Sequence, residues 1–274
     1  MSTMPSPVTI PDTELRMLFS SAVGQEFSIF VALPHTYTQE SKAYPVIYAL
    51  DANGFFGILT DTVRLFALIN DIPEVIIVGI GYPVRTFKDT LGLRTRDLTP
   101  TEIDAAWYEG FKSHFSDPPE YAGSGGAAHF LRFIHEELMP FIDTNYRTMP
   151  EDSTLMGDSF GGLFALYALF SHSDTFRRYV VGSPSVWWDN ETILGLEKDF
   201  AAQNSDVSAK VCLSVGGNEA EVMIAGMYKV ATMLRSREYQ SMELKTRFFE
   251  GETHESVLPA FASWGLRAAF AQKA

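Results

Sequence analysis

Residues 153–170 read STLMGDSFGGLFALYALF, and this stretch sets the architecture that we expect for the rest of the chain. Its first residues form a short apolar run typical of a buried strand, and the residues after Gly161 form a longer apolar run typical of a helix. Gly157 and Gly161 flank the turn between the two runs, where larger side chains would clash with neighbouring backbone. The stretch therefore predicts a strand, a tight turn and a helix in direct succession.

The same alternation continues on both sides of this stretch. Short apolar runs typical of buried parallel strands occupy residues 45–51, 75–82, 177–184, 209–217 and 244–252. Helical patterns occupy residues 127–146, 161–173, 221–239 and 255–272. Residues 14–21 and 26–34 flank a short turn and predict an antiparallel strand pair at the sheet edge. We therefore expect a single α/β domain over residues 1–274, with a mostly parallel, doubly wound sheet that carries its site at the carboxyl ends of the strands.

One segment, residues 83–126, breaks this rhythm. It contains Gly, Pro and six aromatic residues without a sustained period. Long connections of this kind are usually functional or disordered, and so many aromatic side chains are too apolar for a solvated linker. We expect the segment to be an ordered cover over the active site.

Composition restricts the partners. The chain has 274 residues, 46% of them hydrophobic, and a net charge of −13. The charge argues against nucleic acid and anionic membranes as partners, and no apolar run is long enough for a membrane span. The start of the chain shows no export signal, and the single cysteine, Cys212, lies in an apolar strand run. We expect a cytoplasmic protein that binds a small molecule.

The turn in the first stretch, Gly157 to Gly161, has the form G-x-S-x-G. Between a strand and a helix this motif is typical of the nucleophile elbow of α/β-hydrolases, in which the serine is exposed at the helix start. Ser159 is the predicted nucleophile, and the backbone N–H of Phe160 is one predicted oxyanion donor. The loop after residues 45–51, at Asp51 to Asn53, should supply the second donor.

A serine needs a base and an orienting carboxylate, and in this fold both follow the nucleophile along the chain. Of the two histidines after Ser159, His172 ends the helix that Ser159 begins, whereas His254 follows the last strand run in a loop. His254 is therefore the predicted base. For the carboxylate, Glu219 comes first after residues 209–217; the alternatives are Glu221, within the following helix, and Asp189 or Glu191 after the preceding strand. The remaining histidines show no metal-ligand spacing, so we expect neither a metal nor a cofactor.

With these motifs, the chain resembles a known family, the putative esterases that include siderophore trilactone esterases, esterase D and mycolyltransferases. Within this family it is most similar to the bacterial siderophore-esterase-like members. The resemblance covers nearly the whole chain, through VIYALDANGFFG, IVGIGYP, RTRDLTP, FLRFIHEELMPFIDTNYR, GDSFGGLFALYALF, GSPSVWWDN, LSVGGNE and the loop of His254. It implies the triad Ser159, Glu219 and His254, with oxyanion donors at the backbone N–H groups of Phe160 and Asn53. Two positions depart from the family: Asp158 stands where relatives usually have His, and Ala52 where Gly is usual. Asp158 places a negative charge beside the site, which would alter its pH response.

Candidate substrate-binding residues lie in the cover segment and after residues 177–184. Within RTRDLTP, we expect Asp97 to form an ion pair inside the loop and one of Arg94 and Arg96 to face the pocket. Trp107, Trp187 and Trp188 are candidates for an aromatic pocket wall, although at least one of the last two should be core. Three functions remain, in this order: a carboxylesterase for short acyl esters, a siderophore trilactone esterase, and a binding protein without catalytic activity.

Overall fold

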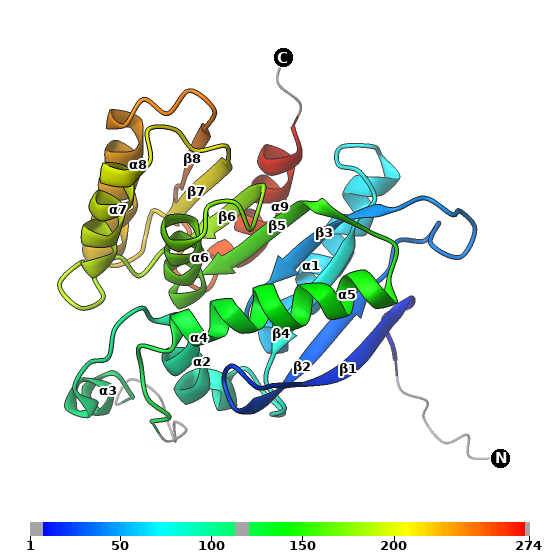
Figure 1. Ribbon diagram of the computed structural model, residues 1–274, viewed down its shortest axis with the longest axis horizontal. Helices are drawn as coiled ribbons and strands as arrows, with labels where there is room; N and C mark the ends of the chain where they lie inside the picture. The colour runs from blue at the N-terminus through cyan, green and yellow to red at the C-terminus, as the bar shows by residue number, and fades with distance from the viewer. Residues whose placement is uncertain (1–7, 113–120, 272–274) are drawn as a thin grey trace.

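The computed structural model describes residues 8–112 and 121–271, and their centre is one eight-stranded sheet (Figure 1). The spatial order of the strands is β1-β2-β4-β3-β5-β6-β7-β8. The strands span Thr13–Ser20 (β1), Gln25–Ala32 (β2), Tyr44–Ala49 (β3), Ile76–Gly81 (β4), Thr148–Asp158 (β5), Arg178–Gly182 (β6), Lys210–Gly216 (β7) and Glu243–Phe249 (β8). Every apolar run that the sequence assigns to a strand therefore forms one.

Strand direction follows the prediction as well. β1 and β2 pair antiparallel at one edge, and β2 is also antiparallel to β4. All other neighbours, from β4 to β8, are parallel. The central strands β3, β4 and β6 consist entirely of buried residues, as expected for strands covered on both faces.

Helices pack on both faces of the sheet. The helical elements span Ala52–Leu68 (α1), Lys88–Thr90 (η1), Leu91–Leu98 (α2), Ala105–Lys112 (α3), Ala127–Arg132 (α4), Phe133–Leu138 (η2), Met139–Asn145 (α5), Phe160–Ser171 (α6), Thr192–Gln203 (α7), Glu221–Ser236 (α8) and Val257–Phe270 (α9). α1 and α9 pack together on one face, whereas α4, α5, α6 and α8 cover the other (Figure 1). The hydrophobic core is accordingly divided by the sheet into two layers.

The cover segment is more regular than its sequence suggests. It contains η1, α2 and α3, each of them eight residues or shorter. α2 packs against α4 and α6, and two backbone hydrogen bonds, Gly126 N to Arg96 O and Ala127 N to Thr99 O, tie the end of the segment to α2. Residues 113–120, with Phe115, lie outside the described residues, as does the side chain of Phe111.

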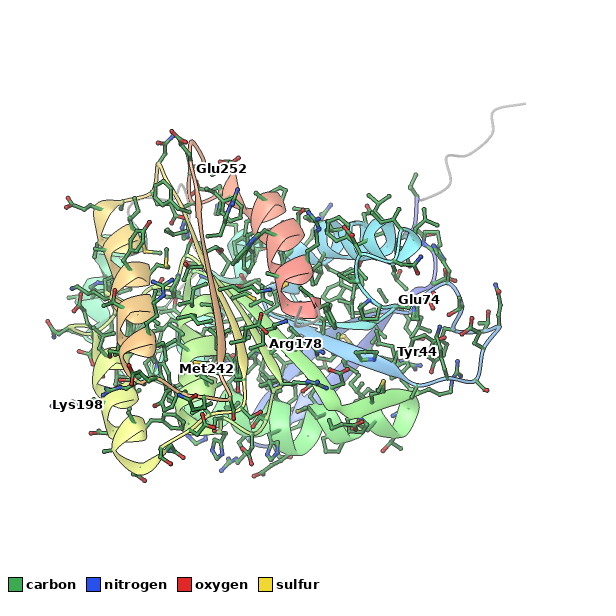
Figure 2. The ribbon with its side chains drawn as sticks, turned by 90° about the horizontal axis from the view of Figure 1, so that it is seen from above. Tyr44, Glu74, Arg178, Lys198, Met242 and Glu252 are labelled. Atoms are coloured by element: carbon green, nitrogen blue, oxygen red, sulfur yellow. The ribbon has the colours of Figure 1, made fainter. Side chains whose placement is uncertain are left out.

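Both ends of the parallel strands are easy to locate. Glu252, just after β8, lies at one end of the sheet, and Arg178 and Met242 lie at the opposite end (Figure 2). The described helices include none that is both long enough and apolar enough to cross a membrane. Cys212 is buried in β7, as predicted, and burial raises the pKa of its thiol to about 12.

Candidate active site

The turn after β5 holds Ser159 in a backbone conformation that residues with a side chain rarely adopt. Ser159 has φ 61° and ψ −119°. A Cβ atom on Gly157 would overlap the backbone of Gly161, which confirms the predicted need for glycine there. At Gly161 the crowding is milder, since the nearest atom to an added Cβ would be Asp51 Oδ2 at 3.2 Å. The strained turn places Ser159 at the start of α6, in the geometry of a nucleophile elbow.

His254 and Glu219 are hydrogen-bonded to each other at the same edge of the sheet. His254 Nδ1 lies 2.7 Å from Glu219 Oε2. The other carboxylate oxygen of Glu219 accepts hydrogen bonds from the Ser183 hydroxyl at 2.5 Å and from Gly216 N at 2.7 Å. The side chain of Glu219 is fully buried, and each of its carboxylate oxygens has a hydrogen-bond partner. By contrast, Glu221 is an exposed residue in the first turn of α8.

The pKa values of this pair follow from these contacts. Burial alone would raise the pKa of Glu219, but the hydrogen bonds from His254, Ser183 and Gly216 outweigh it and lower the pKa. Burial alone would lower the pKa of His254, but the hydrogen bond to Glu219 and the charges of Asp158, Glu219 and Glu255 raise it. A neutral imidazole therefore needs a higher pH here than in a free histidine.

Two loops are joined to hold this pair. The loop after β7, with Glu219, and the loop after β8, with His254, share the backbone hydrogen bonds Gly217 N to Phe249 O and Asn218 N to Glu252 O, both 2.8 Å. The Asn218 side chain adds a third bond, to Gly251 O at 2.9 Å. The carboxylate and the imidazole thus come from loops that cannot move independently.

The start of α1 faces the start of α6. Asp51, in the left-handed region at φ 57° and ψ 35°, precedes the first residue of α1. The Asn53 side chain fixes this helix start, because it donates to Tyr82 O and Val84 O and accepts from Tyr82 N at 2.8 Å. The amide groups of Asn53 and Phe160 belong to the first turns of two helices, which carry a partial positive charge. Such N–H groups suit a developing negative charge, as the sequence predicts for both residues.

A cavity of about 610 Å³ lies beside Ser159 and His254. Much of its wall is apolar, formed by Leu50, Phe55, Phe87, Leu91 and Leu258, and its charged lining residues are Asp51, Arg94, Asp158, His254 and Glu255. Its size is that of a small-molecule site. Phe87, Leu91 and Arg94 come from the cover segment, so this segment does form part of the pocket wall.

The two arginines of the cover segment have different surroundings. Arg94 lines the cavity and makes two 2.8 Å hydrogen bonds to Asp51, and both side chains are nearly buried. Arg96 pairs with Asp97, as predicted for that aspartate, and lines a separate surface cavity. Of the two arginines, Arg94 is therefore the one at the cavity, and Asp51 balances its charge.

The three candidate tryptophans are not among the residues that line the cavity. Trp188 is fully buried and donates through Nε1 to Thr101, so it is the core residue of its pair. Trp107 and Trp187 pack on each other and on Trp188, and Trp187 also contacts the Phe160 ring. Trp187 and Trp188 thus pack against Phe160, the residue that follows Ser159.

Sequence reasoning missed the roles of Ser183 and Asp51. Ser183 directly follows β6, next to the strand that carries Ser159, and this position at a carboxyl end was the available signal. Asp51 stands two residues after the end of β3, also at the carboxyl end of a parallel strand, where the sequence indicates only a loop. His172, as expected, ends α6 away from Ser159.

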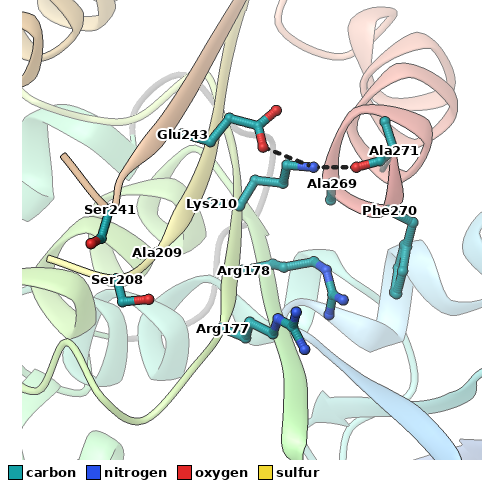
Figure 3. A pocket seen from close by; sticks show the side chains of 10 residues that line it. All are labelled: Arg177, Arg178, Ser208, Ala209, Lys210, Ser241, Glu243, Ala269, Phe270 and Ala271. Atoms are coloured by element: carbon teal, nitrogen blue, oxygen red, sulfur yellow. Dashed lines mark hydrogen bonds and ion pairs between the residues drawn. The ribbon is translucent and has the colours of Figure 1, made fainter. Parts of the chain in front are cut away.

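A second cavity, of about 490 Å³, lies at the opposite end of the strands (Figure 3). Its cations already have partners: Lys210 bonds Glu243 and the carbonyl of Ala271, and Arg178 pairs with Asp152. Within residues 8–112 and 121–271, no group of three His, Cys, Asp or Glu side chains is placed to hold a metal ion.

Comparison with known proteins gives the family. The family model described as "Putative esterase" matches residues 20–266. Ferri-bacillibactin esterase BesA of Bacillus subtilis (strain 168) is 34% identical over 268 residues, which cover 94% of this chain and 90% of that protein.

Two solved structures are also similar. The BES protein from Bacillus cereus has 31% identity and a TM-score of 0.85, covering 99% of this chain and 100% of that one. An IroE-like serine hydrolase from Shewanella oneidensis has 28% identity and a TM-score of 0.80, covering 94% of this chain and 80% of that one. The chain belongs to the putative esterase family and is a carboxylic ester hydrolase with the α/β-hydrolase fold.

Proposed function

We propose that this protein hydrolyses the ester bonds of a siderophore, with Ser159 as nucleophile, His254 as base and Glu219 as the carboxylate that orients the base. The observation that carries the proposal is the 2.7 Å hydrogen bond between His254 and Glu219 at the cavity that Ser159 also lines. No other histidine after Ser159 lies at this edge.

The first half of the reaction is acyl transfer. Ser159 Oγ attacks the ester carbonyl carbon while His254 Nε2 takes the hydroxyl proton, and Glu219 stabilises the resulting imidazolium. The carbonyl oxygen becomes an oxyanion that accepts from the N–H groups of Phe160 and Asn53, each donor being worth about 3 to 4 kcal/mol of barrier. The C–O bond then breaks, and the alcohol leaves with the proton from His254.

The second half frees the enzyme. Water attacks the acyl–Ser159 carbonyl, His254 takes a proton from the water, and the carboxylic acid leaves as Ser159 regains its proton. Both halves need neutral His254 at the start. The raised pKa of His254 therefore predicts that activity falls on the acidic side at a higher pH than for an unperturbed histidine.

The substrate class rests on the relatives. The relative that is 34% identical over nearly all of both chains is named a ferri-bacillibactin esterase, and a relative from Aspergillus fumigatus, 28% identical over 97% of this chain, is named a siderophore triacetylfusarinine C esterase. This favours the siderophore alternative over the short-acyl carboxylesterase that the sequence placed first.

A substrate comparison tests the assignment. The purified protein is given a catecholate trilactone, iron-free and ferric, and 4-nitrophenyl acetate and butyrate, with products measured by liquid chromatography and mass spectrometry. We expect kcat/KM for one trilactone form to exceed that for the nitrophenyl esters by about tenfold or more, because binding energy from the large substrate is used at the reacting bond. Turnover of the nitrophenyl esters without trilactone cleavage would instead identify a short-acyl carboxylesterase.

A further inference from the structure

Asp158 is a cavity residue to which the mechanism above gives no role. It is the last residue of β5, directly precedes Ser159 and lines the same cavity. Its Oδ1 atom is buried without a hydrogen-bond partner among the described residues. Seven buried side-chain atoms of the described residues lack a partner, and Asp158 is the one residue among them that lines this cavity. A buried polar atom without a partner calls for an explanation.

The carboxyl group of Asp158 is partly buried and partly accessible from the cavity. Oδ1 packs so closely on Gly182 that a Cβ atom there would overlap it, and the Phe261 ring lies beside the same glycine. Asp158 as a whole remains partly accessible, and it lines the cavity. Because Oδ1 itself is buried, a substrate group in the cavity can reach Asp158 only at the accessible part of its carboxyl group.

Charges near Asp158 do not neutralise it. Among the described residues that line the cavity, the cationic side chains are His254 and Arg94, and Arg94 donates two hydrogen bonds to Asp51. His254 is bonded through Nδ1 to Glu219. Burial, with smaller contributions from Glu219 and Asp51, raises the pKa of Asp158 to about 7, although His254 and Arg94 oppose the shift. Above that pH, Asp158 is a carboxylate without a counter-ion in contact.

We propose that Asp158 determines specificity: it selects esters that present an O–H, N–H or ammonium donor close to the scissile carbonyl and disfavours esters that carry a negative charge there. A substrate donor in the cavity would hydrogen-bond to the accessible part of the carboxylate, and hydrogen bonds to charged groups are stronger than those between neutral groups. An anionic substrate would meet a like charge in a poorly solvated site, where repulsion is strong. This inference rests on the proposed function in that Ser159 must be the attacking group.

Three methyl esters of similar length test the inference at about pH 8, above the pKa of Asp158. Methyl butanoate has no donor, methyl 3-hydroxybutanoate has one, and monomethyl succinate carries a negative charge. We expect kcat/KM in the wild-type protein to be about tenfold higher for the hydroxy ester, and about tenfold lower for the succinate, than for the butanoate, since tenfold corresponds to about 1.4 kcal/mol.

Two substitutions of Asp158 separate charge from hydrogen bonding. Asp158→Asn keeps an acceptor but removes the charge, so the succinate-to-butanoate ratio should rise about tenfold while part of the hydroxy-ester preference remains. Asp158→Ala should abolish both preferences. Glu255→Gln is the matched control, because Glu255 also lines the cavity but is exposed, and its charge is screened by solvent. It should change the ratios less than about twofold.

The outcomes separate this inference from the proposed function. If Asp158→Asn and Asp158→Ala both leave the ratios within about twofold of wild type, or if Glu255→Gln has an equal effect, Asp158 does not determine specificity. The predicted ratios without trilactone cleavage would support the inference and contradict the siderophore assignment. Equal kcat/KM values for the three methyl esters, together with trilactone cleavage, would contradict the inference and support the siderophore assignment.

Discussion

At the scale of single residues, Glu219 is distinguished from Glu221 by its hydrogen bonds. Three donors, from His254, Ser183 and Gly216, contact the carboxylate of Glu219, whereas Glu221 is exposed two residues further on. The sequence could rank these residues only by distance from the strand end. The difference between the two glutamates depends on Ser183, which follows the neighbouring strand β6. A contact between two strand ends cannot be predicted from a local sequence pattern.

The buried carboxyl group of Asp158 also predicts how stability depends on pH. Its pKa is raised from 3.8 to about 7, so the folded state holds this proton more tightly than the unfolded state. Its contribution to stability is therefore full below about pH 4 and is lost as the pH rises toward 7. Asp158→Asn removes this loss. The difference in unfolding free energy, variant minus wild type, should therefore be larger at about pH 8 than at about pH 5 by about 2 kcal/mol. The variant thus gains stability relative to wild type as the pH rises.

Urea unfolding at the two pH values measures this difference. A matched measurement on Glu255→Gln, which removes an exposed carboxylate from the same cavity, should show almost no pH-dependent difference. An equal difference for Asp158→Asn at both pH values would mean that Asp158 titrates normally.

At the scale of elements, helix α1 depends on Asn53 for its position at the site. Three hydrogen bonds of the Asn53 side chain join the first turn of α1 to the end of β4. Asn53→Ala should lower kcat by about 10- to 100-fold with a smaller change in KM, because the second oxyanion amide would lose its fixed place. It should also lower the free energy of unfolding by about 1 to 3 kcal/mol.

A second position on α1 provides the control. Thr62 is half-buried and its hydroxyl donates to Ile58 O within the helix, so Thr62→Ala should leave kcat near wild type. Steady-state kinetics and thermal unfolding of both variants make the comparison. A stability loss in Asn53→Ala with normal kcat would show that this contact is structural only.

The cover segment shows why some elements escape prediction. η1, α2 and α3 are short, and their sequence mixes Gly, charged and aromatic residues, so no helical period develops. Arg94 and Arg96 are two residues apart on α2, and positions i and i+2 point to different sides of a helix. This spacing explains why Arg94 meets Asp51 at the cavity while Arg96 meets Asp97 away from it.

At the scale of the whole molecule, the sequence predicted the sheet well because buried parallel strands are continuous apolar runs. The eight expected strands all form, with the antiparallel pair at the edge. The carboxyl ends of β5 and β7 then bring Ser159 and Glu219 together with His254 from the loop after β8. The surroundings of single side chains were harder to predict. Trp188 is buried in the core and Arg94 forms an ion pair with Asp51, and both contacts depend on residues distant in sequence.

The most direct test of the proposed catalytic centre is the rate at which an alkyl fluorophosphonate labels Ser159, followed by peptide mass spectrometry. We expect one adduct, on Ser159, because only the activated serine attacks phosphorus. Labelling should slow by about 100-fold or more in His254→Ala and Glu219→Gln, and it should stay near wild type in Glu221→Gln. An adduct on another residue, or slow labelling in Glu221→Gln with normal labelling in Glu219→Gln, would contradict the account.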